Sequence, residues 1–229
     1  IAVHSMKDMP VEQPAGLLLD TYLPREDVRD AFVSLTCAGI ADLAQGATVG
    51  TSSLRRKAQL LARRPDLNVV EFRGNVQTRL KKLGDGVAEA TFLAMAGLNR
   101  LGRDDVKRTA IAPEDMLPAI AQGAIGIERR GDDSRMAEML AAIHHGPTGQ
   151  RLAAERAFLA ALDGSCETPI GGLADLDGGN LRLRGEILRV DGSEVLADDM
   201  TGAVEDGADM GREMAAKLLK LAGPGFLHG

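Results

Sequence analysis

Four arginines lie at or near the starts of two predicted helices, where positive charge is normally unfavourable. Arg55 and Arg56 follow residues 48–53, and Arg73 and Arg79 lie on either side of the second helix start. The helix macrodipole favours anions at an N-terminus, so cations there repel it unless an anion lies between them. Backbone N–H groups, hydroxyls and guanidinium forks together hold such anions. The arginines therefore predict a binding site for a negatively charged ligand.

The charge distribution supports such a site. Residues 51–82 contain nine Lys or Arg and two acidic residues, a net charge of +7, whereas the whole chain carries −6 and the remainder therefore −13. A basic region on an acidic protein attracts an anionic ligand through its local field. A solvated helix face is the preferred interpretation for the other basic residues of the segment, which are Lys57, Arg63, Arg64, Lys81 and Lys82.

Two strand–turn–helix units would position the four arginines. Residues 48–53 and 68–74 each combine an apolar strand with a turn, and a helix follows each of them. Ser52 or Ser53 is the candidate N-cap of the first helix, and Asn75 is that of the second. Both helices have apolar residues at i, i+4 and i+7, namely Leu54, Ala58 and Leu61, then Val76, Leu80 and Leu83.

The first two-thirds of the chain alternates strands with helices, which predicts an α/β fold. Further strands are expected at residues 1–5, 17–22, 30–35, 90–94 and 124–128. A helix at 132–143 would direct Met136, Met139, Leu140 and Ile143 inward.

The last third predicts a small α+β unit. Residues 146–149, Gly-Pro-Thr-Gly, are the best candidate linker. A helix at 150–162 should follow, then a hairpin turning at Asp191-Gly192, then a helix at 204–221. The hairpin strands are expected at 180–190 and 194–198.

Several reactive side chains lie where strands end. In open α/β sheets, ligands bind beyond the carboxyl ends of the strands, where Lys7, Asp8 and Arg100 can join the arginines. On the residues alone, a solvated turn pair is the preferred interpretation of Lys7-Asp8. Cys166 lies in a loop of glycine, serine and proline, which favours exposure, but no neighbouring histidine activates it.

Composition excludes several classes of protein. The chain has 229 residues, no apolar run long enough for a membrane span, only 3% aromatic residues and no tryptophan. Its two cysteines, Cys37 and Cys166, make no disulfide framework and indicate a reducing compartment. His144 and His145 have no partners at metal-ligand spacing, so no metal is expected.

Six segments of the sequence together resemble the porphobilinogen deaminase (hydroxymethylbilane synthase) family. Each motif alone is weak, but six motifs in the family's order are highly specific. The first is Val-His-Ser-Met-Lys-Asp-Met-Pro, and the six segments are residues 3–10, 50–56, 72–79, 93–101, 122–128 and 164–172.

This resemblance implies an α/β fold with two periplasmic-binding-protein-like lobes and a small α+β C-terminal domain. Domain 1 would contain residues 1–23 and 124–143, domain 2 residues 24–123, and the cofactor-carrying domain residues 146–229. Family members begin with a further strand, helix and loop, so we expect an N-terminal segment to precede Ile1 in the complete protein. The resemblance also implies a cytoplasmic monomer.

The activity that the resemblance implies is a transferase of tetrapyrrole (heme and porphyrin) biosynthesis. Four porphobilinogen units are condensed head to tail, with loss of ammonia, onto a dipyrromethane cofactor, and hydroxymethylbilane is released. Cys166 matches the cysteine that binds this cofactor covalently. Asp8 matches the catalytic carboxylate, which would stabilise the cationic azafulvene formed when ammonia leaves.

The remaining site residues match positions that hold carboxylate groups. Every pyrrole carries an acetate and a propionate, so the cofactor and the growing chain form a polyanion that suits guanidinium forks. Arg73, Arg79 and Arg100 would bind substrate. The cofactor-binding residues would be Ser5, Lys7, Asp8, Thr51, Ser53, Arg55, Arg56, Arg73 and Arg79, with Cys166.

Two other classes of function compete with this interpretation. A non-catalytic two-lobed module for small carboxylates would explain the arginines, but neither the Cys166 loop nor Asp8. A nucleic-acid-binding protein would explain the basic segment. The overall negative charge, the few aromatic residues and the lack of a recognisable DNA-binding motif argue against it.

Overall fold

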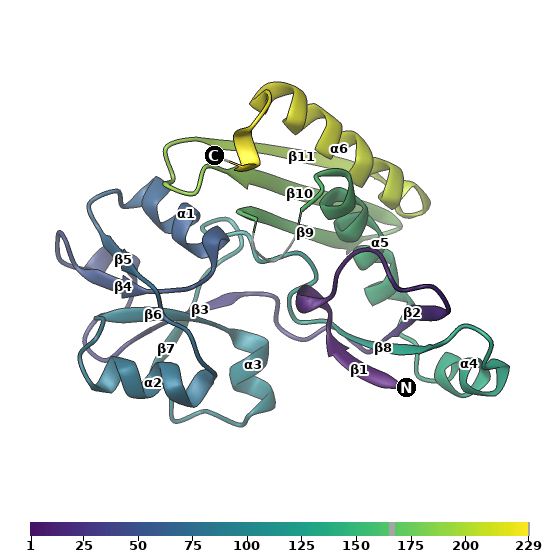
Figure 1. Cartoon of the computed structure of the whole chain (residues 1–229), viewed down its shortest axis with the longest axis horizontal. Coiled ribbons are helices and arrows are strands. Elements are labelled where there is room, and N and C mark those ends of the chain that lie inside the picture. The colour runs from purple at the N-terminus through teal and green to yellow at the C-terminus, as the bar shows by residue number, and fades with distance from the viewer. Residues whose placement is uncertain (165–167, 229) are drawn as a thin grey trace.

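The computed structural model describes residues 1–164 and 168–228 and arranges them around three separate β-sheets (Figure 1). This confirms a mixed α/β fold with a small α+β unit at the C-terminus. Strands of the three sheets come from residues 2–22 with 125–130, from 30–110, and from 170–203. The domain boundaries given above remain a prediction. Among the described residues, no helix is both long and apolar enough to cross a membrane.

The largest sheet contains the two predicted strand–turn–helix units. Its strand order is β5-β4-β6-β3-β7, with β4 parallel to β5 and β6, and β3 antiparallel to β6 and β7. Helices α1, α2 and α3 cover it, and apolar cores fill both of its faces. The strands are β3 (Asp30–Ser34), β4 (Thr48–Gly50), β5 (Asn68–Val70), β6 (Ala90–Ala94) and β7 (Arg108–Ala110), and the helices are α1 (Leu54–Arg63), α2 (Val76–Gly84) and α3 (Met95–Arg100).

A three-stranded antiparallel sheet positions the Lys7-Asp8 pair. Its order is β1 (Ala2–Ser5), β8 (Ile125–Arg130) and β2 (Leu17–Tyr22). The chain leaves β1 directly into the short 3-10 helix η1 (Met6–Asp8). Met6 is fully buried, and a Cβ on Gly126 would come within 2.2 Å of the Met6 sulfur. A glycine in β8 therefore allows Met6 to anchor the turn that carries Lys7 and Asp8.

The C-terminal unit packs two helices against a meander of three strands. Helices α5 (Gly146–Ala161) and α6 (Gly207–Ala222) lie side by side on one face of the sheet (Figure 1). The sheet order is β11 (Val195–Ala203), β10 (Asn180–Leu188) and β9 (Ile170–Asp177), antiparallel throughout. The core between these layers includes the fully buried Phe158, Leu181 and Met214.

A buried glutamate on α5 ties the three units together. Both oxygens of Glu155 accept from Arg25, at 2.6 and 3.0 Å, and they also accept the backbone N–H groups of Ala121 and Ala174. The Glu155 side chain is completely buried and that of Arg25 is 3% exposed. The two chain crossings near residues 25 and 121 are thereby fixed to the C-terminal unit.

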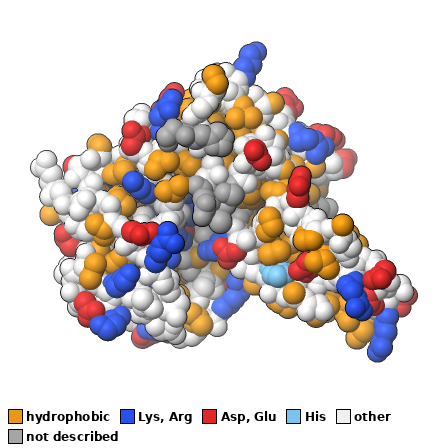
Figure 2. Space-filling model, in the orientation of Figure 1, with side chains coloured by type: hydrophobic (Ala, Val, Ile, Leu, Met, Phe, Trp, Pro, Cys, Tyr) orange, Lys and Arg blue, Asp and Glu red, His pale blue; other side chains and the backbone are white. Residues whose placement is uncertain are grey.

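Several predicted elements need correction. Residues 146–149 are not a linker, since they form the first turn of α5, where Pro147 is well accommodated. Strand β9 was not predicted. The helix expected at 132–143 is shorter, as α4 (Ser134–Ala141), and its inward face is only partly as predicted because Met139 and Ile143 are exposed. Figure 2 shows hydrophobic side chains gathered on the lobe that carries α4.

Candidate active site

A cavity of about 250 Å³ lies where η1, the start of α1 and the start of β9 meet. Side chains from the units of all three sheets contribute to it, and five of them are basic. Among the described residues, Asp8 is the one acid that lines it. The lining residues are Met6, Lys7, Asp8, Ser52, Ser53, Arg55, Arg56, Arg79, Ala119, Ile120, Gln122, Arg156, Leu159, Thr168 and Ile170.

A second cavity of about 380 Å³ adjoins the first and shares Lys7, Asp8 and Leu159 with it. It runs along residues 9–12 and reaches Asp163 and Gly164 after α5. Asp8 is the one carboxylate that the described residues contribute to both cavities, and its exposed side chain is accessible to a ligand in either of them.

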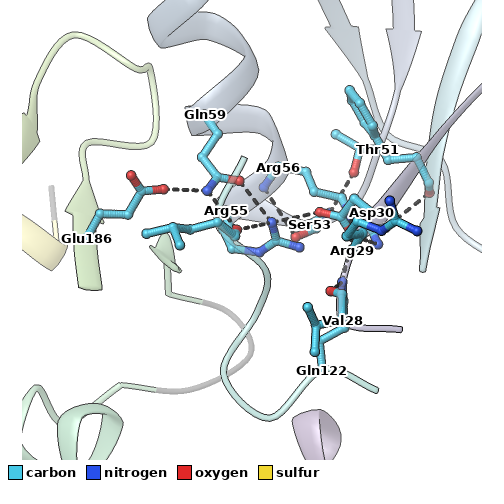
Figure 3. A network of polar contacts seen from close by, with 12 residues as sticks. Val28, Arg29, Asp30, Thr51, Ser53, Arg55, Arg56, Gln59, Gln122 and Glu186 are labelled. Carbon is cyan, nitrogen blue, oxygen red and sulfur yellow. Dashed lines mark hydrogen bonds and ion pairs between the residues drawn. The ribbon is translucent and has the colours of Figure 1, made fainter. Parts of the chain in front are cut away.

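The arginines of α1 form a buried network around Asp30 (Figure 3). Arg55 donates from Nη1 to Asp30 Oδ2 at 2.8 Å, and Arg56 donates from Nη2 to Asp30 Oδ1 at 2.6 Å. Gln122 donates to the same Oδ1 at 2.9 Å. The anion expected between these helix-start arginines is thus supplied by the protein, from strand β3.

Burial and charge act in opposite directions within this network. Burial alone would raise the pKa of Asp30, but the guanidinium groups of Arg55 and Arg56 hold that pKa well below its usual range. Burial also lowers the pKa of Arg55. Arg55 Nε is buried and has no hydrogen-bond partner among the described residues. Because Arg55 lines the first cavity, this donor suits a carboxylate oxygen of a ligand.

The helix caps confirm part of the sequence analysis. Ser53 caps α1 by accepting from the Arg56 N–H, and Asn75 caps α2 by accepting from the Thr78 N–H. Thr51 is buried, and its hydroxyl accepts from the Ser53 N–H at 3.2 Å. The apolar stripe predicted for α1 was only partly correct, because the fully buried Leu60 was missed while Leu54 and Leu61 are half-buried.

The arginines outside α1 differ in their relation to the cavity. Arg79 lines it, and burial together with the Arg56 charge lowers the Arg79 pKa. Arg73 is exposed and pairs with Glu71. Arg100 donates to the Gly123 carbonyl at 2.7 Å. Four of the predicted site residues are not among the described residues that line either cavity, namely Ser5, Thr51, Arg73 and Arg100.

The Lys7 ammonium group, which also lines the cavity, has a lowered pKa. Burial and the neighbouring Arg56 lower the Lys7 pKa to about 8, against the opposing effect of Asp8. A lysine with this pKa changes its charge near neutral pH. A bound anion would favour its protonated form.

Three residues at the site were not found from the sequence. Asp30 and Gln122 complete the buried network, and Arg156 of α5 lines the first cavity. Arg156 donates to the carbonyls of Pro10 and Val11 at 2.7 and 3.1 Å, which holds the strand-to-loop segment beside Asp8. No local pattern could reveal these contacts, because each joins segments distant in sequence.

The predicted attachment residue, Cys166, lies outside the described residues. The nearest described residues on either side of it do line the site. Gly164 borders the second cavity and Thr168 borders the first. Cys37, by contrast, is a free, half-buried cysteine beside the 3-10 helix η2 (Ile40–Asp42) of the large-sheet unit.

The fold and site together define an α/β protein with a small α+β unit that closes one side of a cavity rich in basic side chains. Family models match most of the chain. Residues 1–138 match the porphobilinogen deaminase dipyromethane cofactor binding domain, and residues 150–220 match the porphobilinogen deaminase C-terminal domain.

Curated relatives agree with these models. The chain is 68% identical over 218 residues to porphobilinogen deaminase of Paracoccus denitrificans, covering 95% of this chain and 70% of that protein. It is 51% identical over 232 residues to the chloroplastic porphobilinogen deaminase of Pisum sativum, covering 100% of this chain and 63% of the relative. The chain therefore belongs to the porphobilinogen deaminase family, whose members are hydroxymethylbilane synthases of tetrapyrrole biosynthesis.

Solved structures give a weaker likeness. A YaeC-family lipoprotein of Enterococcus faecalis matches at 18% identity and a TM-score of 0.38, covering 56% of this chain and 62% of that one. An arginine-specific periplasmic binding protein of Salmonella typhimurium matches at 15% identity and a TM-score of 0.35, covering 54% and 56%. The α/β class rests instead on the sheets themselves and on the family models.

Proposed function

We propose that this protein condenses four porphobilinogen units head to tail, releasing ammonia and finally hydroxymethylbilane. The observation that carries the proposal is the cavity pair with Asp8 at its junction and basic side chains around it. Porphobilinogen carries two carboxylates and a leaving amine, so it needs cations to bind it and a carboxylate to assist departure of the amine.

The residues that line the first cavity fit a dipyrromethane cofactor. Such a group supplies the pyrrole carbon onto which substrate units are added. Arg55, with its unpartnered Nε among the described residues, and Arg56, Arg79 and Lys7 would hold its carboxylates. Ser53 lines the same cavity, while Ser5 and Thr51 would act from beside it. Cys166 would attach the cofactor covalently, supported by the cavity contacts of Gly164 and Thr168.

Asp8 would carry the catalytic proton transfers. Its carboxyl group can donate a proton to the leaving amine of porphobilinogen and later accept the proton displaced from the attacked pyrrole. In its ionised form it stabilises the positive charge that develops on the substrate carbon as ammonia leaves. Its exposure at the junction of the two cavities supports access to successive substrate units.

Substrate carboxylates would be held by Arg73, Arg79 and Arg100. Arg79 lies at the cavity, whereas Arg73 is exposed near the start of α2 and Arg100 is bonded to the crossing at Gly123. We further propose that the protein is a monomer working in the cytoplasm, a reducing compartment. The plant relative named above is chloroplastic.

Intact-mass spectrometry with peptide mapping tests the covalent assignment. The apo-protein should gain the mass of a dipyrromethane on incubation with porphobilinogen, and the modified peptide should contain Cys166. Cys166→Ser should abolish the gain, whereas the matched control Cys37→Ser should retain it. No adduct on the wild-type protein, or an adduct that persists in Cys166→Ser, would refute the assignment and favour a simple carboxylate-binding module.

A second experiment tests the role of Asp8. Asp8→Asn should lower kcat about 10²- to 10⁴-fold, the usual contribution of a positioned acid–base group. Glu12→Gln is the matched control, because Glu12 lines the second cavity without reaching the first. Equal losses in both variants would contradict a specific role for Asp8.

A further inference from the structure

A line of hydrogen bonds leads from the C-terminal sheet to the candidate active site (Figure 3). Glu186 of β10 accepts a hydrogen bond from the side-chain amide of Gln59 on α1. The Gln59 oxygen in turn accepts from Arg55 Nη1 at 2.9 Å. Both residues are buried: Gln59 is completely buried and Glu186 is 8% exposed.

The partners of Gln59 fix the orientation of its amide group. Its Nε2 donates one hydrogen to the Leu117 carbonyl at 2.9 Å and the other to Glu186. Because both hydrogens are used on this side, Oε1 is turned toward Arg55. A reversed amide would present a donor to the guanidinium group and leave the carboxylate of Glu186 without its hydrogen bond.

The surrounding backbone leaves this pair little freedom. A Cβ on Gly171 of β9 would lie 3.0 Å from Glu186 Oε1, 3.1 Å from Leu117 Cβ and 3.2 Å from Gln59 Nε2. Strand β9 therefore packs directly on the contact, and the absence of a side chain at residue 171 makes the close approach possible.

The same contacts hold one end of the guanidinium group of Arg55, which lines the first cavity. Nη1 is held by Asp30, Gln59 and the Leu117 carbonyl, all within 2.9 Å. Nε has no hydrogen-bond partner among the described residues, although it is buried. Anchoring Nη1 with three acceptors fixes the orientation of the guanidinium plane, while Nε keeps an unused donor hydrogen among the described residues.

We propose that Gln59 and Glu186 are positioning residues that hold the Arg55 guanidinium in the orientation needed to bind a cofactor carboxylate. This role rests on the proposed function and extends it to the C-terminal sheet. Glu186 clamps the amide of Gln59, and Gln59 holds Arg55. The α+β unit thus contributes to the first cavity through a contact that touches no ligand.

Cofactor assembly on the apo-protein measures this role separately from turnover. The readout is the porphobilinogen concentration that gives half-maximal rate of mass gain. Gln59→Met and Glu186→Met should each raise this concentration about threefold to tenfold, the effect of weakening one buried hydrogen bond to Arg55, with the maximal rate within about twofold. Glu186→Gln should behave like wild type, because its amide oxygen still accepts from Gln59.

Two comparisons decide whether the effect passes through Gln59. Glu186→Met should add nothing further in a Gln59→Met background. Asp198→Leu, a carboxylate of the neighbouring β11 paired with Lys217, should leave assembly unchanged. Three results would each overturn the proposal. Glu186→Met could leave the half-saturating porphobilinogen concentration unchanged, or it could raise that concentration by the same factor in the Gln59→Met background. Asp198→Leu could raise it as much as Glu186→Met does.

Failure of the proposed function would look different, since wild type itself would then acquire no adduct. In that case a double-mutant cycle on chemical unfolding still tests the contact. Gln59→Met and Glu186→Met should be non-additive by about fivefold or more in the unfolding equilibrium constant. Additive effects would show that the two side chains do not act as a pair.

Discussion

The two strand–turn–helix units of the large sheet carry the same kind of sequence and use their arginines differently. In the first, β4 and α1, both arginines are buried and share Asp30 as an internal counterion. In the second, β5 and α2, Arg73 is exposed beside Glu71, and Arg79 is half-buried with its Nε bonded to the Gly74 carbonyl. One local pattern therefore serves a fixed, prebuilt network and an open cationic surface.

The difference follows from what lies opposite each helix start. Strand β3 and the crossing at Gln122 face α1 and provide a carboxylate and an amide. At the start of α2, the Asn75 cap and the hydrogen bond from Arg79 Nε to the Gly74 carbonyl are both made within residues 74–79. A preorganised group loses little entropy when a ligand binds, whereas an exposed guanidinium must be ordered by its ligand. We therefore expect the first unit to dominate stability and the second to affect mainly binding.

The largest expected effect is on the first unit. Asp30→Asn should lower the free energy of unfolding by about 3–5 kcal/mol, because Arg55 and Arg56 would remain buried without a counterion. The depressed pKa of Asp30 gives the wild type stability that is present above the unfolded-state pKa of about 3.9 and is lost as pH falls below it. Chemical denaturation at several pH values measures both.

Asp66→Asn provides the matched control for that variant. Asp66 also pairs with an arginine of the first unit, Arg64, but the pair is solvent-accessible. Solvent screens exposed pairs, so the loss of stability should be small. A similar loss in both variants would show that burial does not distinguish the Asp30 network.

The pH dependence of stability should reveal the charge of Lys7, whose pKa is lowered by burial and by Arg56 of the first unit. Its pKa of about 8 lies below the ordinary 10.5, so between these values the unfolded chain binds a proton that the folded protein does not. Stability should therefore rise with pH across this window. Lys7→Met should be more stable than wild type below pH 8, by roughly 1–3 kcal/mol, with the difference fading by about pH 10.5. A constant difference at all pH values would contradict this assignment.

The second unit should respond in binding and not in stability. Arg73→Met should raise KM for porphobilinogen about tenfold while changing the free energy of unfolding by less than about 0.5 kcal/mol. Lys81→Met is the control, since Lys81 is an exposed cation of the same strand–turn–helix unit, paired with Asp85. Steady-state kinetics and denaturation on both variants separate a specific contact from general loss of positive charge.

Local signals in the sequence predicted local structure well. The strands β4 and β6 and the caps Ser53 and Asn75 were found because they depend on residues a few positions apart. Strand β9 was missed because Gly171 and Gly172 indicate a loop. In the structure, these glycines allow Gln59, Glu186 and Ile120 to approach the strand closely.

The site was only partly predictable, for a different reason. The arginine positions revealed an anion site, but the sequence could not show that Asp30, 25 residues before Arg55, neutralises two of them. Arg156 is separated from Pro10 by 146 residues, and Glu186 from Gln59 by 127. Such contacts are set by how the three sheets pack together, which no periodicity records.

The smallest expected effects come from removing the two helix caps, Asn75 and Ser53. Asn75 accepts from the Thr78 N–H at 2.9 Å and from its hydroxyl at 2.9 Å, whereas Ser53 accepts from the Arg56 N–H at 3.4 Å. Asn75→Ala should therefore cost about 1 kcal/mol and Ser53→Ala less, although α1 contributes more buried residues to the core. Thermal and chemical unfolding measure the order. A larger loss for Ser53→Ala would mean that its position beside the buried arginines, and not cap geometry, determines its contribution.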